Sequence, residues 1–187
     1  NSVSTHHHQS IQIHLFDVDI PGRVRLMESD STKPGKNLRI CDSPIGKLGL
    51  SVCYDVRFPG LYTTLVENGA DILLIPAAFT QTTGMAHWEV LLRARAIENQ
   101  CYVLAAAQTG RHNEKRASYG DAMIVDPWGT VVARGGSTGE NLAVVAEIDL
   151  DRIKQIRKCM PKSSHRRPDL YSSSTSSTHT KVAVSNI

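Results

Sequence analysis

Three short apolar runs along the chain predict buried β-strands. They are GKLGLSVC at 46–53, ADILLIPAAF at 70–79 and CYVLAAAQTG at 101–110. Each run is largely apolar in its middle, which is typical of strands that are covered on both faces of a parallel sheet. The first run ends at Cys53, and α/β proteins place ligands and chemistry at the carboxyl ends of such strands.

The segments between these runs have the spacing of helices. Pro59 precedes LYTTLVEN, in which Leu61 and Leu65 share one face, and Gly69 follows its end. Proline in front and glycine behind is the expected order for a helix. A longer helix is predicted from about Met85 to Gln100. Strand, helix and strand in this order predict parallel crossovers.

The pattern changes beyond residue 110. DAMIVDP and TVVAR flank Asp126–Gly129, a turn with proline second and glycine fourth, which predicts an antiparallel hairpin. NLAVVAEIDL at 141–150 predicts one further strand, and Asp149 is placed to cap a helix that runs to Met160. Parallel units with a hairpin predict an α/β fold, a layered sandwich in which helices cover the sheets.

Charge and hydropathy exclude two classes of partner. The net charge of +3 lies entirely in residues 161–187, and residues 1–160 hold 17 basic and 17 acidic side chains. A body without net charge has no field to attract nucleic acid or an anionic membrane surface. No apolar run approaches the length of about 20 residues that spans a bilayer. We therefore expect neither a nucleic-acid partner nor a membrane.

The cysteines and histidines do not have metal-site spacing. No C-x-x-C pair occurs among Cys41, Cys53, Cys101 and Cys159, which fits neither a disulfide framework nor a zinc site and indicates a reducing compartment. His6–His8 is interpreted as a solvated or tag-like run rather than a metal site. We expect no metal and no cofactor, and a thiol redox or metal protein has little support.

Cys53 is the candidate nucleophile because charged residues follow it at once. Tyr54, Asp55 and Arg57 come directly after it, and Asp55 and Arg57 are expected to form ion pairs that fix this loop. The competing interpretation is that Cys53 packs as a small hydrophobic residue, as free cysteines usually do. The other three cysteines have no comparable surroundings.

Several segments in order resemble one family. GKLGLSVCYDVRFPG, HWEVLLRARAIENQ, HNEKRASYGDAMIVDPWGTVVAR and HRRPDLY, together with HLFDVDIPGRVRLMES, are similar to the Nit branch of the nitrilase superfamily of carbon–nitrogen hydrolases. The resemblance covers roughly residues 14–171. It implies an α-β-β-α sandwich that pairs into a homodimer or higher oligomer. It also implies a Cys nucleophile, a Glu base and a Lys that stabilises the tetrahedral intermediate.

The resemblance assigns roles to six residues of this chain. Cys53 matches the nucleophile, and the backbone N–H of Tyr54 matches an oxyanion donor. Glu28 matches a carboxylate that orders the site; the alternative is a solvated loop residue. The matching pocket positions are Phe79, Thr80 and His87, although His87 and the following Trp88 equally suit the start of a packed helix.

The sequence departs from the family pattern near its start. Gln12 stands where the family has its Lys, and no segment before His14 resembles the one that holds the base Glu. We therefore expect three parts: a non-family segment at 1–13, a partial hydrolase domain at 14–171 that lacks the N-terminal third of the sandwich, and a Ser/Thr-rich disordered tail at 172–187.

The functional expectation follows from the resemblance and has one rival. The family implies an amidase that hydrolyses a small α-keto acid monoamide such as deaminated glutathione through a Cys thioester, in the cytoplasm or also in mitochondria. Some members carry a fused Fhit domain, which is the further partner the resemblance implies. The rival hypothesis is an inactive fragment that acts by association with intact subunits, because both the Lys and the base are missing from the matched segments.

Overall fold

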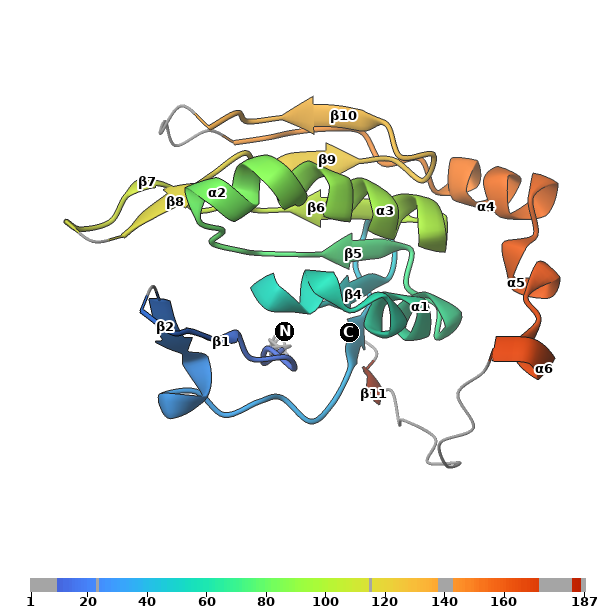
Figure 1. Ribbon diagram of the computed structural model, residues 1–187. Coiled ribbons are helices and arrows are strands. Elements are labelled where there is room, and N and C mark those ends of the chain that lie inside the picture. The colour runs from blue at the N-terminus through green and yellow to red at the C-terminus, as the bar shows by residue number, and fades with distance from the viewer. Residues whose placement is uncertain (1–9, 23, 115, 138–142, 172–182, 186–187) are drawn as a thin grey trace, which may run out of the picture.

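A seven-stranded mixed sheet forms the centre of the molecule in this computed structural model (Figure 1). The structure describes residues 10–22, 24–114, 116–137, 143–171 and 183–185. The strand order is β10-β9-β6-β5-β4-β3-β11. The bounds are β3 Arg39–Cys41, β4 Leu48–Leu50, β5 Ile72–Leu74, β6 Tyr102–Ala105, β9 Met123–Val125, β10 Val131–Arg134 and β11 Ala183–Ser185.

The three predicted apolar runs form the parallel centre of this sheet. β4 pairs with β5 and β5 pairs with β6 in parallel register, as the strand-helix-strand pattern predicts. β3 and β9 flank them in antiparallel orientation, and β10 forms the predicted hairpin with β9. The strands are shorter than the runs, so β4 ends three residues before Cys53.

Helices cover both faces of the sheet. Helices α1 (Pro59–Glu67) and α3 (Glu89–Asn99) pack on one face, where Leu73 and Val103 are fully buried. Helix α4 (Leu150–Cys159) covers the other face through Ile153. Alternate residues of a strand point to opposite faces, so a strand covered on both sides is apolar throughout, and the α/β prediction is confirmed.

The predicted helix at 85–100 has three parts. It begins at Gln81 with the short α2 (Gln81–Thr83), continues through a π-helical turn at Gly84–Trp88, and ends as α3 with Gln100 in the left-handed region at φ +51°. Tyr119 packs so closely on Gly84 that a Cβ at this position would overlap the tyrosine ring. The π-helical turn therefore starts where only glycine fits.

Smaller elements lie at the two ends of the molecule. The hairpins β1–β2 (Asp17–Ile20, Val24–Met27) and β7–β8 (Thr109–Arg111, Ala117–Tyr119) lie at one end in Figure 1, while α4, α5 (Lys162–His165) and α6 (Pro168–Tyr171) lie at the other. Two 3₁₀ turns, η1 (Glu28–Asp30) and η2 (Cys53–Arg57), complete the elements near the candidate nucleophile.

Two expectations about the C-terminal part differ from the structure. Residues 143–149 run beside the domain without forming a strand, so the prediction of a strand at 141–150 is wrong for the described residues. Ala183–Ser185 pairs in parallel with β3, against the expectation of a disordered tail. By contrast, Asp149 caps α4 as predicted, accepting from the backbone N–H groups of Asp151 and Arg152. His6–His8 lies outside the described residues.

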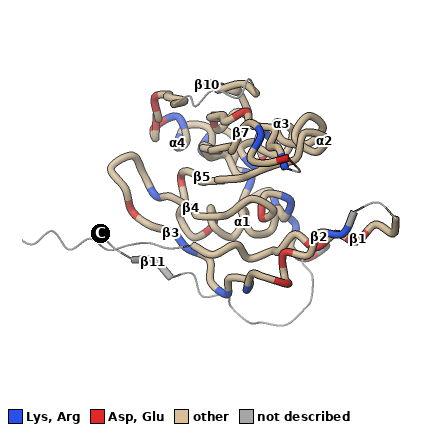
Figure 2. The backbone as a smooth tube through the Cα atoms, turned by 90° about the vertical axis from the view of Figure 1, so that its left-hand side faces the viewer, with Lys and Arg blue, Asp and Glu red and all other residues tan. Residues whose placement is uncertain are grey.

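Charged residues are spread over the molecule. Figure 2 shows basic and acidic positions interspersed along the described backbone. In the part of the chain that the structure describes, no helix has the length and apolar character needed to cross a membrane.

Candidate active site

Cys53 lies at the first position of the 3₁₀ turn η2, directly after the extended Val52. Its φ is +48°, in the left-handed region that residues other than glycine rarely adopt. The backbone N–H of Cys53 donates to the carbonyl of Pro76 (2.8 Å), which follows β5. Strained backbone of this kind is concentrated at functional sites, where the surrounding structure holds it in place. Cys53 is half-buried and packs against the main core.

Opposing influences act on the thiol of Cys53. Burial raises its pKa, and the nearby charges of Glu28 and Asp55 raise it further. The backbone N–H groups of Ala78 and Tyr54 donate toward the sulfur and act in the opposite direction. The net pKa of Cys53 is raised, so the thiol needs a proton acceptor to react as a thiolate. The same two N–H groups are donors beside the atom that would carry the acyl group.

Gln12 and Glu28 form a buried polar pair near this thiol. Gln12 is 8% exposed, and its side-chain Nε2 donates to Glu28 Oε2 (2.7 Å) and to the carbonyl of His14 (2.8 Å). Glu28 Oε2 also accepts from the backbone N–H of Phe16 (2.7 Å). Glu28 is thus an ordered, partly buried carboxylate, which favours the site-ordering interpretation over that of a solvated loop residue.

Asp55 ties the N-terminal segment to the turn that carries Cys53. Its carboxylate accepts from the backbone N–H groups of Ile13, His14 and Val52, and Oδ1 lies 2.9 Å from His14 Nδ1. Asp55 is 1% exposed and its partner is His14, whereas Arg57 forms no ion pair among the described residues, so the expectation of an ion pair is wrong for Arg57. A buried carboxylate needs several donors, and these backbone groups supply them.

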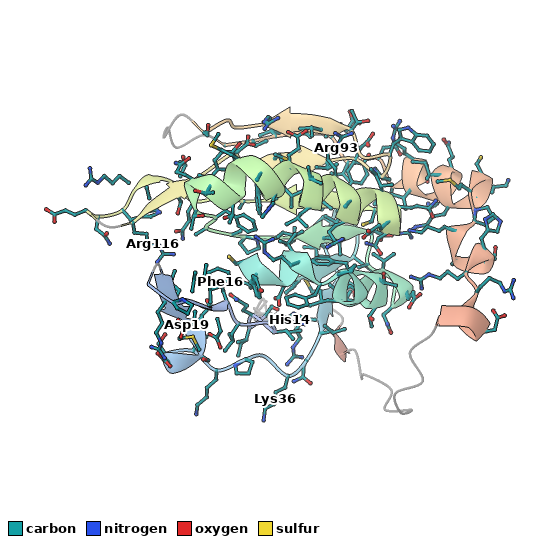
Figure 3. All side chains as sticks on the ribbon, in the orientation of Figure 1. His14, Phe16, Asp19, Lys36, Arg93 and Arg116 are labelled. Atoms are coloured by element: carbon teal, nitrogen blue, oxygen red, sulfur yellow. The ribbon has the colours of Figure 1, made fainter. Side chains whose placement is uncertain are left out.

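Aromatic contacts also connect the N-terminal segment to the turn that carries Cys53. His14 stacks on Phe58 with ring centroids 3.6 Å apart, and Tyr54 makes edge contacts with Phe16 and Phe58. In Figure 3, His14 and Phe16 lie between the β1–β2 hairpin and helix α1. The backbone of Tyr54 therefore has a fixed orientation beside Cys53, because its ring is held by neighbours on both sides.

The other predicted pocket residues divide between core and surface. Phe79 is buried and packs on Trp88, whose Nε1 donates to the carbonyl of Asp121 (2.8 Å), so Trp88 belongs to the core. Thr80 is exposed and caps α2. His87 is exposed, and its Nδ1 lies 3.2 Å from Arg57 Nη2.

The structure brings Cys53, Tyr54, Phe79 and His87 to one region, and Arg57 connects them. The guanidinium carbon of Arg57 lies 5.8 Å from the Tyr54 ring centroid and 5.4 Å from that of Phe79. Sequence reasoning missed the N–H of Ala78 and the contact between Arg57 and His87. The one signal for Ala78 was its place at the end of the second apolar run, which meets the end of the first in a parallel sheet.

A cavity of about 310 Å³ lies elsewhere, between the ends of α1, α3 and α5. Its lining includes Thr63, Asn99 and Arg166 and does not include Cys53. The substrate pocket that the resemblance implies, lined by Phe79, Thr80 and His87, stays a prediction. Among the described residues, no three His, Cys, Asp or Glu side chains are grouped so that they could hold a metal ion.

Comparison with known proteins gives consistent matches. The Carbon-nitrogen hydrolase family matches residues 7–158. Deaminated glutathione amidase of Bos taurus is 61% identical over 159 residues, covering 84% of this chain and 48% of the relative. The nitrilase and fragile histidine triad fusion protein NitFhit of Caenorhabditis elegans is 58% identical over 161 residues, covering 86% of this chain and 36% of the relative. This chain therefore spans about half or less of their length.

A solved structure agrees with the sequence matches. The crystal structure of the C. elegans NitFhit protein superposes with a TM-score of 0.81 at 58% identity and covers 86% of this chain and 39% of that chain. The expected fold is thereby confirmed as nitrilase-like over the matched part.

Proposed function

Because the chain belongs to the carbon–nitrogen hydrolase family, we propose that it hydrolyses the C–N bond of a linear amide through a thioester on Cys53. The observation that carries the proposal is the thiol itself. Cys53 is held at a positive φ at the start of η2, and the backbone N–H groups of Ala78 and Tyr54 act to lower the pKa of its thiol. A cysteine that only filled the core would need neither feature.

The proposed reaction has two halves. The Cys53 thiolate attacks the amide carbonyl carbon, an S–C bond forms, and the carbonyl electrons move to the oxygen. Backbone N–H groups offset the oxyanion, and the amine leaves with a proton as the C–N bond breaks. Water then attacks the thioester, releasing the carboxylic acid and returning the thiol.

Gln12 is expected to limit the rate at which this chain hydrolyses amides. It lies beside Glu28 within the group of residues around Cys53, where the family pattern has a cationic Lys. A neutral amide donates a hydrogen bond but supplies no positive charge, so it offsets a developing oxyanion less well. We expect slow turnover with Gln12 and faster turnover with a lysine.

The proposed substrate is a small α-keto acid monoamide such as deaminated glutathione. The support is the name of the relatives, four mammalian proteins among them, that are called deaminated glutathione amidase. A Fhit domain is a proposed partner because a C. elegans relative is named as a fusion with one. We propose the cytoplasm or mitochondria as the location because the cysteines lack disulfide spacing.

The second candidate function is association with intact subunits of the same family, without turnover. The specific observation in its favour is the neutral Gln12 at the lysine position, combined with large exposed apolar side chains such as Val90 and Trp128. Mixing the chain with bovine deaminated glutathione amidase and recording native mass spectra tests this candidate. A mixed oligomer with altered amidase activity supports it, and separate species contradict it.

The amidase proposal is tested with three versions of the chain. Loss of deaminated glutathione is followed by mass spectrometry for the chain itself, for Gln12→Lys and for Cys53→Ala. We expect Gln12→Lys to raise the rate by about 10²- to 10³-fold, the scale associated with one oxyanion donor. Glu28, 2.7 Å from the Gln12 amide, would pair with the new charge.

The control is Cys159→Ala, which removes an exposed thiol that has no place at the site. It should match the chain that retains all four cysteines. Cys53→Ala should show no hydrolysis, either alone or combined with Gln12→Lys. Equal rates with and without the Cys53 thiol would overturn the proposal.

A further inference from the structure

The cavity of about 310 Å³ that lies away from Cys53 is lined by three cationic side chains. Arg157 comes from α4, Lys162 is the first residue of α5, and Arg166 directly follows α5. In Figure 1, α5 lies beside the ends of α1 and α3, whose last residues line the cavity from the other side. The cavity therefore has the C-terminal ends of two helices on one side and three positive charges on the other.

The carboxylates that line the cavity do not balance these charges. The lining has two of them, Glu67 and Glu98. Glu98 Oε2 lies 2.8 Å from Nη1 of the buried Arg95, and Glu67 pairs with Arg166. Lys162 Nζ donates to the backbone carbonyl of Glu98 and forms no ion pair with a carboxylate of the described residues. The charge of Lys162 is therefore left without a carboxylate partner.

The surroundings of Lys162 carry an excess of positive charge. Burial lowers the pKa of its ammonium group, Glu98 acts in the opposite direction, and the charge of Arg166 lowers the pKa further. Arg157 adds to the excess, because its ion pair with Asp71 Oδ1 spans 3.8 Å, which is too long for a hydrogen bond. A bound anion would relieve the repulsion between these cations.

We infer that the cavity where Arg157, Lys162 and Arg166 converge binds a small phosphate monoester, at a site separate from Cys53. Such a group carries about −1.5 to −2 charges near neutral pH and has several strong acceptor oxygens. Its tetrahedral shape accepts hydrogen bonds from cations in several directions, whereas a carboxylate accepts in one plane. A volume of about 310 Å³ is small for a ligand pocket, which suits a small molecule. The inference goes beyond hydrolysis at Cys53 and does not rest on it.

The competing explanation is that the cations only cap helix ends. Lys162 meets the carbonyl of Glu98 in the last turn of α3, and Arg157 Nε donates to the carbonyl of Gln100 (3.2 Å), which follows α3. Cations near a helix C-terminus stabilise it by interacting with the last carbonyls and the helix dipole. Lys162 uses only one ammonium hydrogen in this contact, so its other donors stay available to a ligand.

Titration with glycerol 3-phosphate distinguishes these roles. Isothermal titration calorimetry at constant ionic strength measures its affinity for the whole chain, and glycerol is the uncharged reference. Hydrogen exchange with and without the phosphate ester reports where it binds. The variants are Lys162→Gln, Lys162→Arg and the matched control Lys158→Gln, which removes an exposed charge of α4 that does not line the cavity.

We expect saturable binding of glycerol 3-phosphate and no binding of glycerol. Lys162→Gln should weaken the affinity about tenfold, because one unit charge is removed beside the phosphate. Lys162→Arg, which retains the charge, should keep most of the affinity, and Lys158→Gln should match the unaltered chain. Hydrogen exchange should slow in the peptides that contain α5, because the ligand ties this helix to α4.

A role limited to capping predicts a different result. Lys162→Gln would then lower the midpoint of urea unfolding and leave the affinity for the phosphate ester unchanged, which would overturn the proposed site. Absence of binding to the unaltered chain, or equal losses in Lys162→Gln and Lys158→Gln, would overturn it as well. Protection from exchange elsewhere and none in α5 would do so without any variant. Because none of these measurements depends on turnover, their failure would leave the proposed nucleophile unaffected.

Discussion

At the scale of single residues, the reactivity of Cys53 depends on contacts from distant parts of the chain. The neighbouring sequence places the thiol after β4, but Glu28 and Ala78 reach it from other segments. Burial and the charge of Glu28 raise the pKa of the thiol, and backbone donors act in the opposite direction. At neutral pH the thiol form therefore dominates until a base removes its proton.

Replacing Glu28 by glutamine should make Cys53 more reactive toward iodoacetamide near neutral pH. The substitution removes a negative charge that raises the thiol pKa, so the pH profile of alkylation should move to lower pH. Stopped samples analysed by mass spectrometry give the profile. Asp151→Asn, which removes an exposed carboxylate on α4, is the control and should leave the profile in place. A shift to higher pH with Glu28→Gln would contradict the charge argument.

The contrast between sequence neighbours and distant contacts also explains how much of the site could be predicted. Cys53 and Phe79 follow apolar runs, and adjacent parallel strands bring such ends together, so sequence pattern was enough to pair them. Arg57 and His87 are 30 positions apart and meet only because the fold brings the π-helical turn Gly84–Trp88 to η2. The local pattern favoured ion pairs for both Asp55 and Arg57, because it contains no information about the backbone donors that occupy Asp55.

At the scale of elements, the pattern of apolar residues was enough to predict the central strands and the helices that pack on them. β4, β5, β6, α1 and α4 were predicted because their burial is regular along the sequence. Residues 143–149 begin with an apolar run, Ala-Val-Val-Ala, but form no strand in the described structure. Apolar character indicates burial and does not by itself supply a pairing partner. The division of the 81–100 segment into α2, a π-helical turn and α3 depends on packing against Tyr119, which no helical period reports.

Gly84→Ala should destabilise the fold, and Gly60→Ala should not. At Gly84 a methyl group would overlap the ring of Tyr119, whereas at Gly60 in α1 it would meet nothing within 4 Å. We expect a loss of about 1–3 kcal/mol for Gly84→Ala from overpacking. We expect a gain of about 0.4–1 kcal/mol for Gly60→Ala, because alanine restricts the unfolded chain. Urea unfolding measures both, and equal effects of the two substitutions would contradict the close contact at Gly84.

At the scale of the whole molecule, residues 1–160 carry no net charge, so we expect exposed apolar surface to determine how the chain associates. Val90 and Ile97 are separated by two turns on the exposed side of α3, and Arg93 between them donates to the carbonyl of Gly129 in the β9–β10 turn. Exposed Trp128 precedes that glycine. Large apolar side chains gathered near one helix favour contact with another protein surface.

We expect the 187-residue chain to self-associate and Ile97→Glu to weaken that association. Ile97 is 46% exposed on α3, and a carboxylate there would have to be desolvated when the α3 surface becomes covered. Ile45→Glu is the matched control, because Ile45 is 45% exposed and lies between β3 and β4, next to Gly46, whose backbone approaches Leu150 of α4. Light scattering during gel filtration measures the mass of each version.

Because both side chains are half-exposed, neither substitution should change the fold, and coincident circular dichroism spectra would verify this. A chain that elutes as a monomer at every concentration and melts in one sharp transition would show that the α3 surface needs no partner. Dissociation by Ile45→Glu alone would place the contact on the opposite side of the sheet.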